Sequence, residues 1–292
     1  MTCTKNLRPR FTSNFAKCYR VLAWSSLCLL VPLNAWAFVV YERESAEVNR
    51  IAKEITRGCG NSHEKLEALL RYMAFDVPAE NNHSYFLLPV FRVLRPTPLQ
   101  IIQQGGDCSY KSRALNVMLR RRGISAERYG LHLPSGEGVH AVTLVHTKRG
   151  DYIVDVLFGI IFMHEDGSPI TFDEMMHNHD LLVKTISREI ANGNPKAAKY
   201  PLSRYIYSDV RTINLEQYRW TAAIRRVLIS IFGKDAIDLF PRPKIMSEPA
   251  LVVISGSALL ECAIFAPLAA ARISNRRRRS SVSVRTTAGC GT

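Results

Sequence analysis

Two long apolar runs frame the chain, and the residues between them carry shorter patterns of mixed character. Val21–Val40 contains no charged residue and is about as long as a bilayer is thick. Ala250–Ile273 is also long enough to cross a membrane, with Glu261 near its middle, a costly place for a carboxylate. A buried helix of a soluble protein is the alternative for this second run.

The first run has two interpretations that stay open. Ala35-Trp36-Ala37 follows an apolar stretch and a basic leader, as in a cleavable signal peptide, and Pro32 and Asn34 interrupt the run near that site. An uncleaved membrane anchor of the same length is the other interpretation. Both place residues 41–247 outside the cytoplasm.

Between the runs, the spacing of apolar residues predicts helices and then strands. Helices are expected over 42–57, 61–74, 97–104, 108–122, 172–192 and 215–232, and strands over 124–133, 139–147 and 151–157. Tyr85–Leu94 is ambiguous between strand and helix. In the last helix, apolar residues share one stripe: Trp220, Ile224, Val227, Leu228 and Ile231. One helix followed by an antiparallel meander predicts an α+β fold.

Several residues predict where these helices begin. Asn61 with Glu64 three residues later is a capping pattern, and Thr97 before a proline is another. Gly105-Gly106 should break the chain before Asp107, which can cap a helix that has Cys108 in its first turn.

The net charge of +14 is concentrated in two tails. Residues 1–20 carry +5 and residues 272–292 carry +6, with no acidic residue in either, so the remainder is nearly balanced. Basic residues beside apolar runs are typical of the cytoplasmic side of a membrane protein. Tails that bind nucleic acid are the alternative. We therefore expect a membrane as partner, and no nucleic acid.

Of the seven cysteines, only Cys59 and Cys108 lie in the part expected to fold outside the membrane. A disulfide framework is therefore not expected, despite the oxidising compartment. A bridge between these two cysteines is conceivable, but it would block the thiol considered next.

Cys108, His140 and Asp155 are the candidate catalytic residues. A helix N-terminus stabilises an anion such as a thiolate, and the Cys108 N–H could stabilise an oxyanion, with Gln103 or Gln104 as second donor. His140 and Asp155 lie in neighbouring predicted strands, and a buried aspartate needs a partner. A thiol, an imidazole and a carboxylate form a nucleophile, its base and the group that orients the base. Taken separately, Cys108 could be an ordinary buried thiol, His140 a surface histidine and Asp155 an aspartate next to a turn.

These segments together resemble a known family. Gly105–Gly130 (GGDCSYKSRALNVMLRRRGISAERYG), His140-Ala141-Val142 and Tyr152–Gly159 (YIVDVLFG) are similar to the transglutaminase-like, papain-like core over roughly residues 45–160. The resemblance implies Cys108 as nucleophile, His140 as base and Asp155 as the orienting carboxylate. It also implies amide chemistry through a thioester, resolved by water or by an amine, without a metal or organic cofactor.

Two other families share part of this pattern. Asp107-Cys108-Ser109 is similar to the start of a class of cell-wall endopeptidases, which usually have a second histidine where Asp155 stands here. Asp155–Gly159 (DVLFG) is similar to a motif of arylamine N-acetyltransferases, whose acetyl-coenzyme A is not expected outside the cytoplasm. The region from Ser247 through the arginines after Ile273 also resembles a protein-sorting tail, without its first proline.

The expected organisation has six parts: a basic cytoplasmic leader (1–20), a signal peptide or anchor (21–40), a transglutaminase-like domain (41–205), a helical extension and linker (206–247), a transmembrane helix (250–273) and a basic cytoplasmic tail (274–292). The expected function is a membrane-anchored cysteine hydrolase or acyltransferase on the periplasmic or extracellular side. Its substrate would be a peptide, protein or cell-envelope amide. A non-catalytic module that binds a peptide or polymer in the same cleft is the alternative.

Overall fold

The computed structural model describes residues 11–79, 95–133, 137–148, 150–205, 207, 210–213, 215, 219–238, 240 and 243–287. The chain divides into two units, Glu42–Pro249 and the pair of segments Met1–Tyr41 and Ala250–Thr292. The ambiguous stretch Tyr85–Leu94 and residues 134–136 of the turn after the first strand lie outside the described residues.

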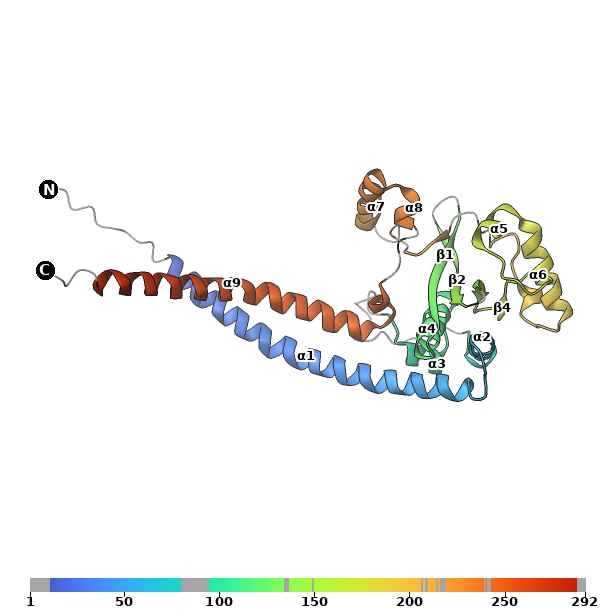
Figure 1. The fold of residues 1–292 in the computed structure, drawn as a ribbon, viewed down its shortest axis with the longest axis horizontal. Coiled ribbons are helices and arrows are strands. Elements are labelled where there is room, and N and C mark those ends of the chain that lie inside the picture. The colour runs from blue at the N-terminus through green and yellow to red at the C-terminus, as the bar shows by residue number, and fades with distance from the viewer. Residues whose placement is uncertain are drawn as a thin grey trace. The chain divides into compact units, whose positions relative to one another are not determined.

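The described elements follow the order expected from the sequence (Figure 1). The helices are α1 (Phe11–Ile55), α2 (Ser62–Arg71), α3 (Pro98–Gln104), α4 (Cys108–Arg121), α5 (Phe172–His177), α6 (His179–Ala191), α7 (Arg219–Phe232), α8 (Lys234–Asp238) and α9 (Pro249–Thr287). Shorter helical turns are the π-helix Tyr72–Asp76 and the 3-10 turns Ala197–Lys199 and Lys244–Ser247. The strands are β1 (Ser125–His132), β2 (Gly138–Thr147), β3 (Gly150–Asp155), β4 (Ile160–Ile161) and β5 (Val210–Arg211).

The strands form one antiparallel sheet in the order β4-β3-β2-β1-β5. The three longest strands are the meander predicted from the sequence, and β4 and β5 extend it at its two edges. The mixed helix and antiparallel sheet confirm the α+β class.

Alternating residues of the sheet face two different cores. Val145 and Val154 belong to a core shared with α2, α3, α4 and the end of α1. Val142 and Ile153 belong to a second core, shared with α5, α6 and the segment that leads to β5. This period-two alternation is the one that a strand buried on both faces requires. The sheet is therefore covered by helices on both faces, and α4 packs directly against β1 and β2.

The cap residues predicted from the sequence are confirmed. The side chain of Asn61 accepts from Glu64 N at the start of α2, and Thr97 forms a capping box with Gln100 at the start of α3. Asp107 accepts from Tyr110 N at the start of α4. These side chains satisfy backbone N–H groups that a helix start leaves without partners.

Two predicted helix boundaries are wrong. The single helix expected over 172–192 is broken at Asn178, whose φ of −135° and ψ of 87° leave the helical region. The Asn178 side chain caps the following helix instead, accepting from Asp180 N. The helix expected to begin at 42 is the end of the much longer α1, which runs without a break from Phe11 to Ile55.

The smaller unit consists of α1 up to Tyr41 and α9 from Ala250. Two described stretches are long and apolar enough to cross a membrane, Val21–Ile55 and Pro249–Pro267. Within this unit, Asn34 Nδ2 donates to Glu261 Oε1 at 3.2 Å, and the Ser257 hydroxyl donates to Asn34 Oδ1. Glu261 is therefore hydrogen-bonded to the other helix, which offsets part of the cost of a carboxylate in an apolar run.

Candidate active site

Cys108 is the first residue of α4 and follows a sharp turn after α3. Its side chain is half-buried, and its thiol is free. The first-turn N–H groups of a helix have no intrahelical acceptor, so they and the helix dipole stabilise a negative charge at this position. The structure therefore places a partly accessible sulfur at the N-terminus of a helix.

The turn before Cys108 requires glycine because another chain segment passes against it. Gly105 has a φ of 93°, and a Cβ atom there would lie 2.5 Å from the carbonyl oxygen of Pro78. The next residue, Gly106, donates its N–H to that same oxygen at 3.1 Å. Gly105-Gly106 is thus a close backbone approach as well as a helix break.

A buried lysine ties the same segment to α4. Lys111 Nζ donates to the carbonyl oxygens of Met73 at 2.9 Å and Val77 at 2.6 Å, and its side chain is fully buried. Burial, followed by the charge of Lys196, lowers the pKa of Lys111 to about 8. Lys196 itself donates to the carbonyl oxygen of Ala74. Two lysines therefore hold the end of the π-helix beside the turn that positions Cys108.

His140 and Asp155 form a fully buried pair. His140 Nε2 lies 2.6 Å from Asp155 Oδ2, and both side chains have no exposed surface. Thr143 pairs with Val154, so Asp155, at the end of β3, lies diagonally across from His140. The other carboxylate oxygen accepts from the N–H groups of Leu157 at 3.0 Å and Phe158 at 3.3 Å. Asp155 thus has partners for both oxygens, as a buried carboxylate requires.

The electrostatics of this pair favour a protonated imidazole. Burial works against the charged form of His140, but the charge and hydrogen bond of Asp155, with a smaller contribution from Cys108, raise its pKa to about 10. Asp155 occupies Nε2, and Nδ1 has no hydrogen-bond partner among the described residues. Nδ1 is therefore the ring nitrogen left to interact with the Cys108 thiol.

Sequence reasoning missed an aromatic group that encloses the imidazole. The ring of Tyr205 stacks on that of His140, with centroids 4.0 Å apart and planes within 7°. Phe158 and Tyr200 complete the group, with their own ring centroids 4.8 Å apart. Burial raises the pKa of Tyr205, and the charges of Cys108 and Asp155 raise it further. The three closely spaced tyrosines at 200, 205 and 207 were the available sequence signal.

The structure places His140 in contact with Asp155 and within interaction range of Cys108. Gln103 and Gln104 are both exposed at the C-terminal end of α3. The conceivable bridge between Cys59 and Cys108 is absent, because both thiols are free.

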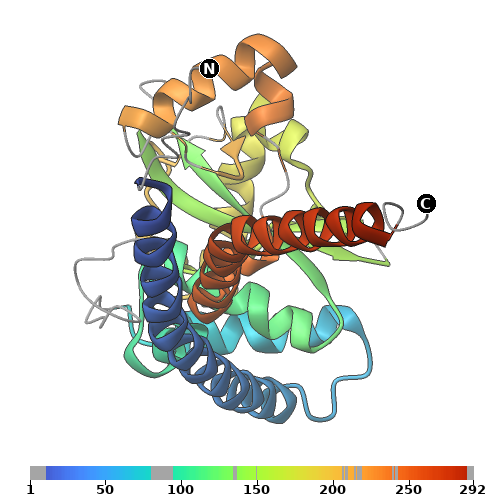
Figure 2. The ribbon, with the colours of Figure 1, turned by 90° about the vertical axis from the view of Figure 1, so that its left-hand side faces the viewer.

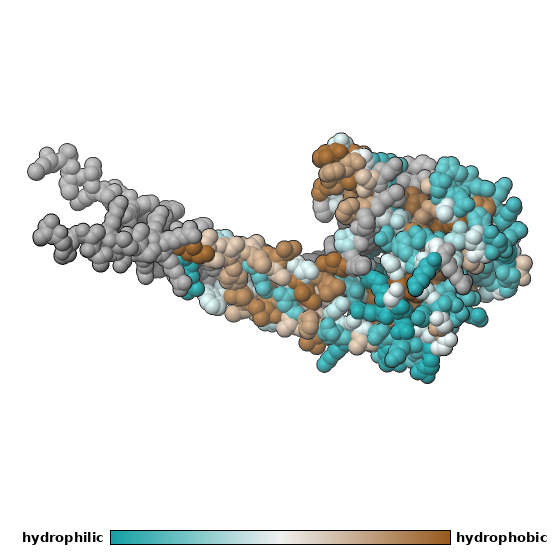
Figure 3. Space-filling view, in the orientation of Figure 1, coloured by the Kyte–Doolittle hydropathy of each residue, from teal (hydrophilic) through white to brown (hydrophobic). Residues whose placement is uncertain are grey.

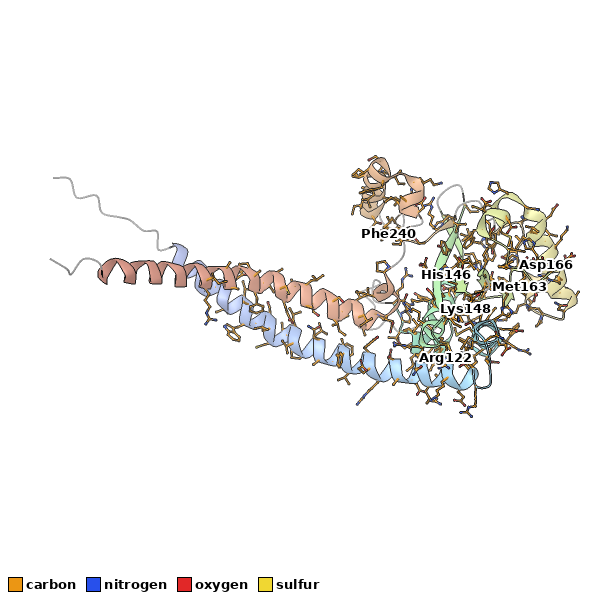
Figure 4. The ribbon with its side chains drawn as sticks, in the orientation of Figure 1. Arg122, His146, Lys148, Met163, Asp166 and Phe240 are labelled. Atoms are coloured by element: carbon orange, nitrogen blue, oxygen red, sulfur yellow. The ribbon has the colours of Figure 1, made fainter. Side chains whose placement is uncertain are left out.

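The described residues contain no group of three or more His, Cys, Asp and Glu side chains able to hold a metal ion. His177 and His179, which the sequence places close together, are exposed at the end of α5 and the start of α6. A cavity of about 600 Å³ lies elsewhere, beside Met163 and Asp166 (Figure 4), and no residue of the triad lines it.

Comparison with family models, with curated proteins and with solved structures finds no match for this chain. The geometry of the site is therefore the basis for any assignment of function.

Proposed function

We propose that the protein is a membrane-anchored cysteine hydrolase or acyltransferase of transglutaminase-like type, acting on amide bonds of peptides, proteins or cell-envelope material. One observation carries this proposal: His140 engages the buried Asp155 through Nε2 at 2.6 Å, which leaves Nδ1 for a thiol at the start of a helix. A nucleophile, a base and an orienting carboxylate are the three parts that thiol catalysis of acyl transfer requires.

In the proposed reaction, the Cys108 thiolate attacks the amide carbonyl carbon and a tetrahedral oxyanion forms. The protonated His140 gives its proton to the leaving amine as the C–N bond breaks, and a thioester remains on Cys108. Neutral His140 then takes a proton from water or from a second amine, which attacks the thioester; the C–S bond breaks, the acid or the new amide leaves, and the Cys108 thiolate and protonated His140 are restored. Asp155 keeps the imidazole oriented and stabilises its charged form through both steps.

The oxyanion needs hydrogen-bond donors close to the thiol. The Cys108 backbone N–H is one, because it lies in the first turn of α4 and has no intrahelical acceptor. Gln103 or Gln104 remains our proposal for the second. The exposed position of both amides at the end of α3 leaves them free to turn toward a bound substrate.

We also propose that the domain holding the triad faces the periplasm or the cell exterior. The support is the placement of charge: both ends of the chain are basic, and each stands next to an apolar helix. Hydrolysis or transfer of envelope amides is the chemistry that this compartment makes available.

Alkylation of thiols by iodoacetamide tests the catalytic proposal on the full-length protein in detergent. An ordinary cysteine is only about 3% thiolate at pH 7, so a thiol held as an ion pair should react up to about 30-fold faster. Cys59 is the matched control, since it is also a free and half-buried thiol. We expect Cys108 to label much faster than Cys59 and to lose this advantage in His140→Ala. Equal rates for the two thiols at pH 7 would reject catalysis and favour a binding module.

A further inference from the structure

Helix α7 exposes much of its apolar stripe to solvent. Ile224, Val227 and Ile231 lie on one side of the helix, and their exposed fractions are 46%, 59% and 64%. On the opposite side, Arg225 is only 8% exposed. A surface helix normally buries its apolar stripe and exposes its charges, whereas α7 exposes these three apolar residues and buries Arg225, with Leu228 half-buried.

Neighbouring aromatic residues enlarge this surface. Phe232 at the end of α7 is 61% exposed, and Phe240 just after α8 is 55% exposed. Figure 3 shows apolar side chains gathered over α7 and α8, and Figure 4 places Phe240 next to them. We call these five residues the α7 patch: Ile224, Val227, Ile231, Phe232 and Phe240. A contiguous apolar patch of this kind marks a surface that contacts a membrane or another protein.

Buried polar contacts hold the patch outward. Arg225 Nη2 donates to Asp238 Oδ1 and to Asp238 Oδ2, both at 2.7 Å, so the arginine binds both oxygens of the carboxylate. Thr212, just after β5, donates its N–H to the Asp238 carbonyl oxygen at 2.8 Å and its hydroxyl to that of Phe240 at 2.6 Å. Turning the patch inward would break this buried ion pair, which is costly. The exposure of the patch is thus built into the fold.

The chain itself indicates what covers the patch. Pro249, where the candidate membrane span Pro249–Pro267 begins, comes nine residues after Phe240. Nine extended residues reach at most about 32 Å, so α7 is tethered close to any membrane that α9 enters. Arg226 of α7 is also exposed, and α7 contains no acidic residue. An apolar stripe, an exposed cation and a short tether are features of a helix that lies in a membrane interface.

We propose that the α7 patch docks into the headgroup–acyl boundary of a membrane rich in anionic phospholipid. The apolar side chains enter the boundary, and Arg226 lies among the phosphate groups. This inference rests on the proposed membrane anchoring of the chain, and it is independent of the proposed chemistry at Cys108. Because Asp238 links α8 to β5, docking holds the β5 edge of the sheet at the lipid surface.

Quenching of tryptophan by brominated lipids tests the proposal on the full chain in vesicles. The sequence contains three tryptophans, so replacing Trp24, Trp36 and Trp220 by phenylalanine leaves a background without tryptophan fluorescence. In that background, Val227→Trp places the probe in the patch. Ile190→Trp is the matched control, because Ile190 is a 47% exposed aliphatic residue on α6, well separated from α7 in Figure 1.

We expect acyl-chain bromines to quench Val227→Trp and not Ile190→Trp, and the quenching to weaken when anionic lipid is omitted. Adding Ile231→Asp should abolish it, with Cys108 alkylation unchanged. A chain that keeps only Trp36 reports on anchoring: if Trp36 is not quenched, the anchoring fails and this inference fails with it. If Trp36 is quenched while Val227→Trp is not, docking to lipid is wrong and a protein surface, such as a second copy, covers the patch.

Discussion

At the scale of single residues, contacts from several elements fix the position of His140. Asp155 engages one ring nitrogen, Tyr205 stacks on the ring face, and Cys108 interacts with the imidazole. A ring held in this way cannot rotate away from the thiol without losing a charged hydrogen bond and a stacked contact. Such preorganisation is what the proposed role of His140 as a base requires.

The raised pKa of His140 predicts how stability depends on pH. The pKa is about 10 in the folded protein and about 6.5 when unfolded, so the stabilisation by the proton is complete below pH 6.5 and is lost as pH rises through 10. Asp155→Asn removes the charge that raises this pKa. We expect the melting temperature of wild type to exceed that of Asp155→Asn most at pH 6, and the difference to shrink steadily toward pH 10. Lys111 titrates near 8 in both proteins and cancels in the comparison. A difference that stays constant or grows with pH would contradict the assigned charge state.

At the scale of elements, α7 shows that the direction of an amphipathic helix is set by its partners. Its apolar stripe is visible in the sequence, but Ile224, Val227 and Ile231 of this stripe face solvent because Arg225 has a buried partner. The link from Asp238 to Thr212 then fixes the α7–α8 pair to the sheet, at the end of the larger unit away from α2, α3 and α4 (Figures 1 and 2).

Adjacent arginines of α7 should therefore have very different effects on stability. Arg225→Met leaves the buried Asp238 carboxylate without its two-bond partner and should lower the free energy of unfolding by about 3 kcal/mol. Arg226→Met changes an exposed side chain and should cost no more than about 0.5 kcal/mol. Thermal unfolding of both variants in detergent provides the comparison. Similar losses in the two variants would mean that Arg225 does not anchor the helix pair.

At the scale of the whole molecule, the first apolar run is part of an unbroken helix. The helix α1 passes through Ala35-Trp36-Ala37, the site that resembles a signal-peptidase cleavage site, without leaving the helical conformation. Ala23 and Ala37, two small residues of this run, are fully buried. The bond from Asn34 to Glu261 gives this run a second structural role that a cleaved signal peptide could not perform.

We therefore expect the mature protein to retain its first 40 residues. Intact mass measurement of protein extracted from membranes should give the full-length chain, and a chain that begins at Phe38 would contradict this. Asn34→Leu removes the amide partner of Glu261 and should reduce the yield of membrane-inserted protein, whereas Ser26→Leu, eight residues earlier in the same helix, should not. A reporter that is active only outside the cytoplasm should be inactive when fused after Thr292, because the arginine-rich tail favours the cytoplasmic side.

Local chemistry in the sequence determined where most helices and strands begin and which residues are candidates for the site. The caps at Asn61, Thr97 and Asp107 and the periodicity of the three long strands are short-range signals, because a cap or a strand face depends on residues only two to four positions away. The order of thiol, imidazole and carboxylate on a helix start and two neighbouring strands was also visible, and it led to the candidate site.

Only the tertiary structure decided which groups meet and which faces stay open. Tyr205 stacks on His140 although 65 positions separate them in the sequence. Lys111 likewise donates to the carbonyl oxygens of Met73 and Val77, which lie 38 and 34 positions away. The sequence alone leaves open which side of α7 faces the protein, and the hydrogen bond between Arg225 and Asp238 determines it. Each of these outcomes is a competition between distant partners for the same space, which local periodicity does not encode.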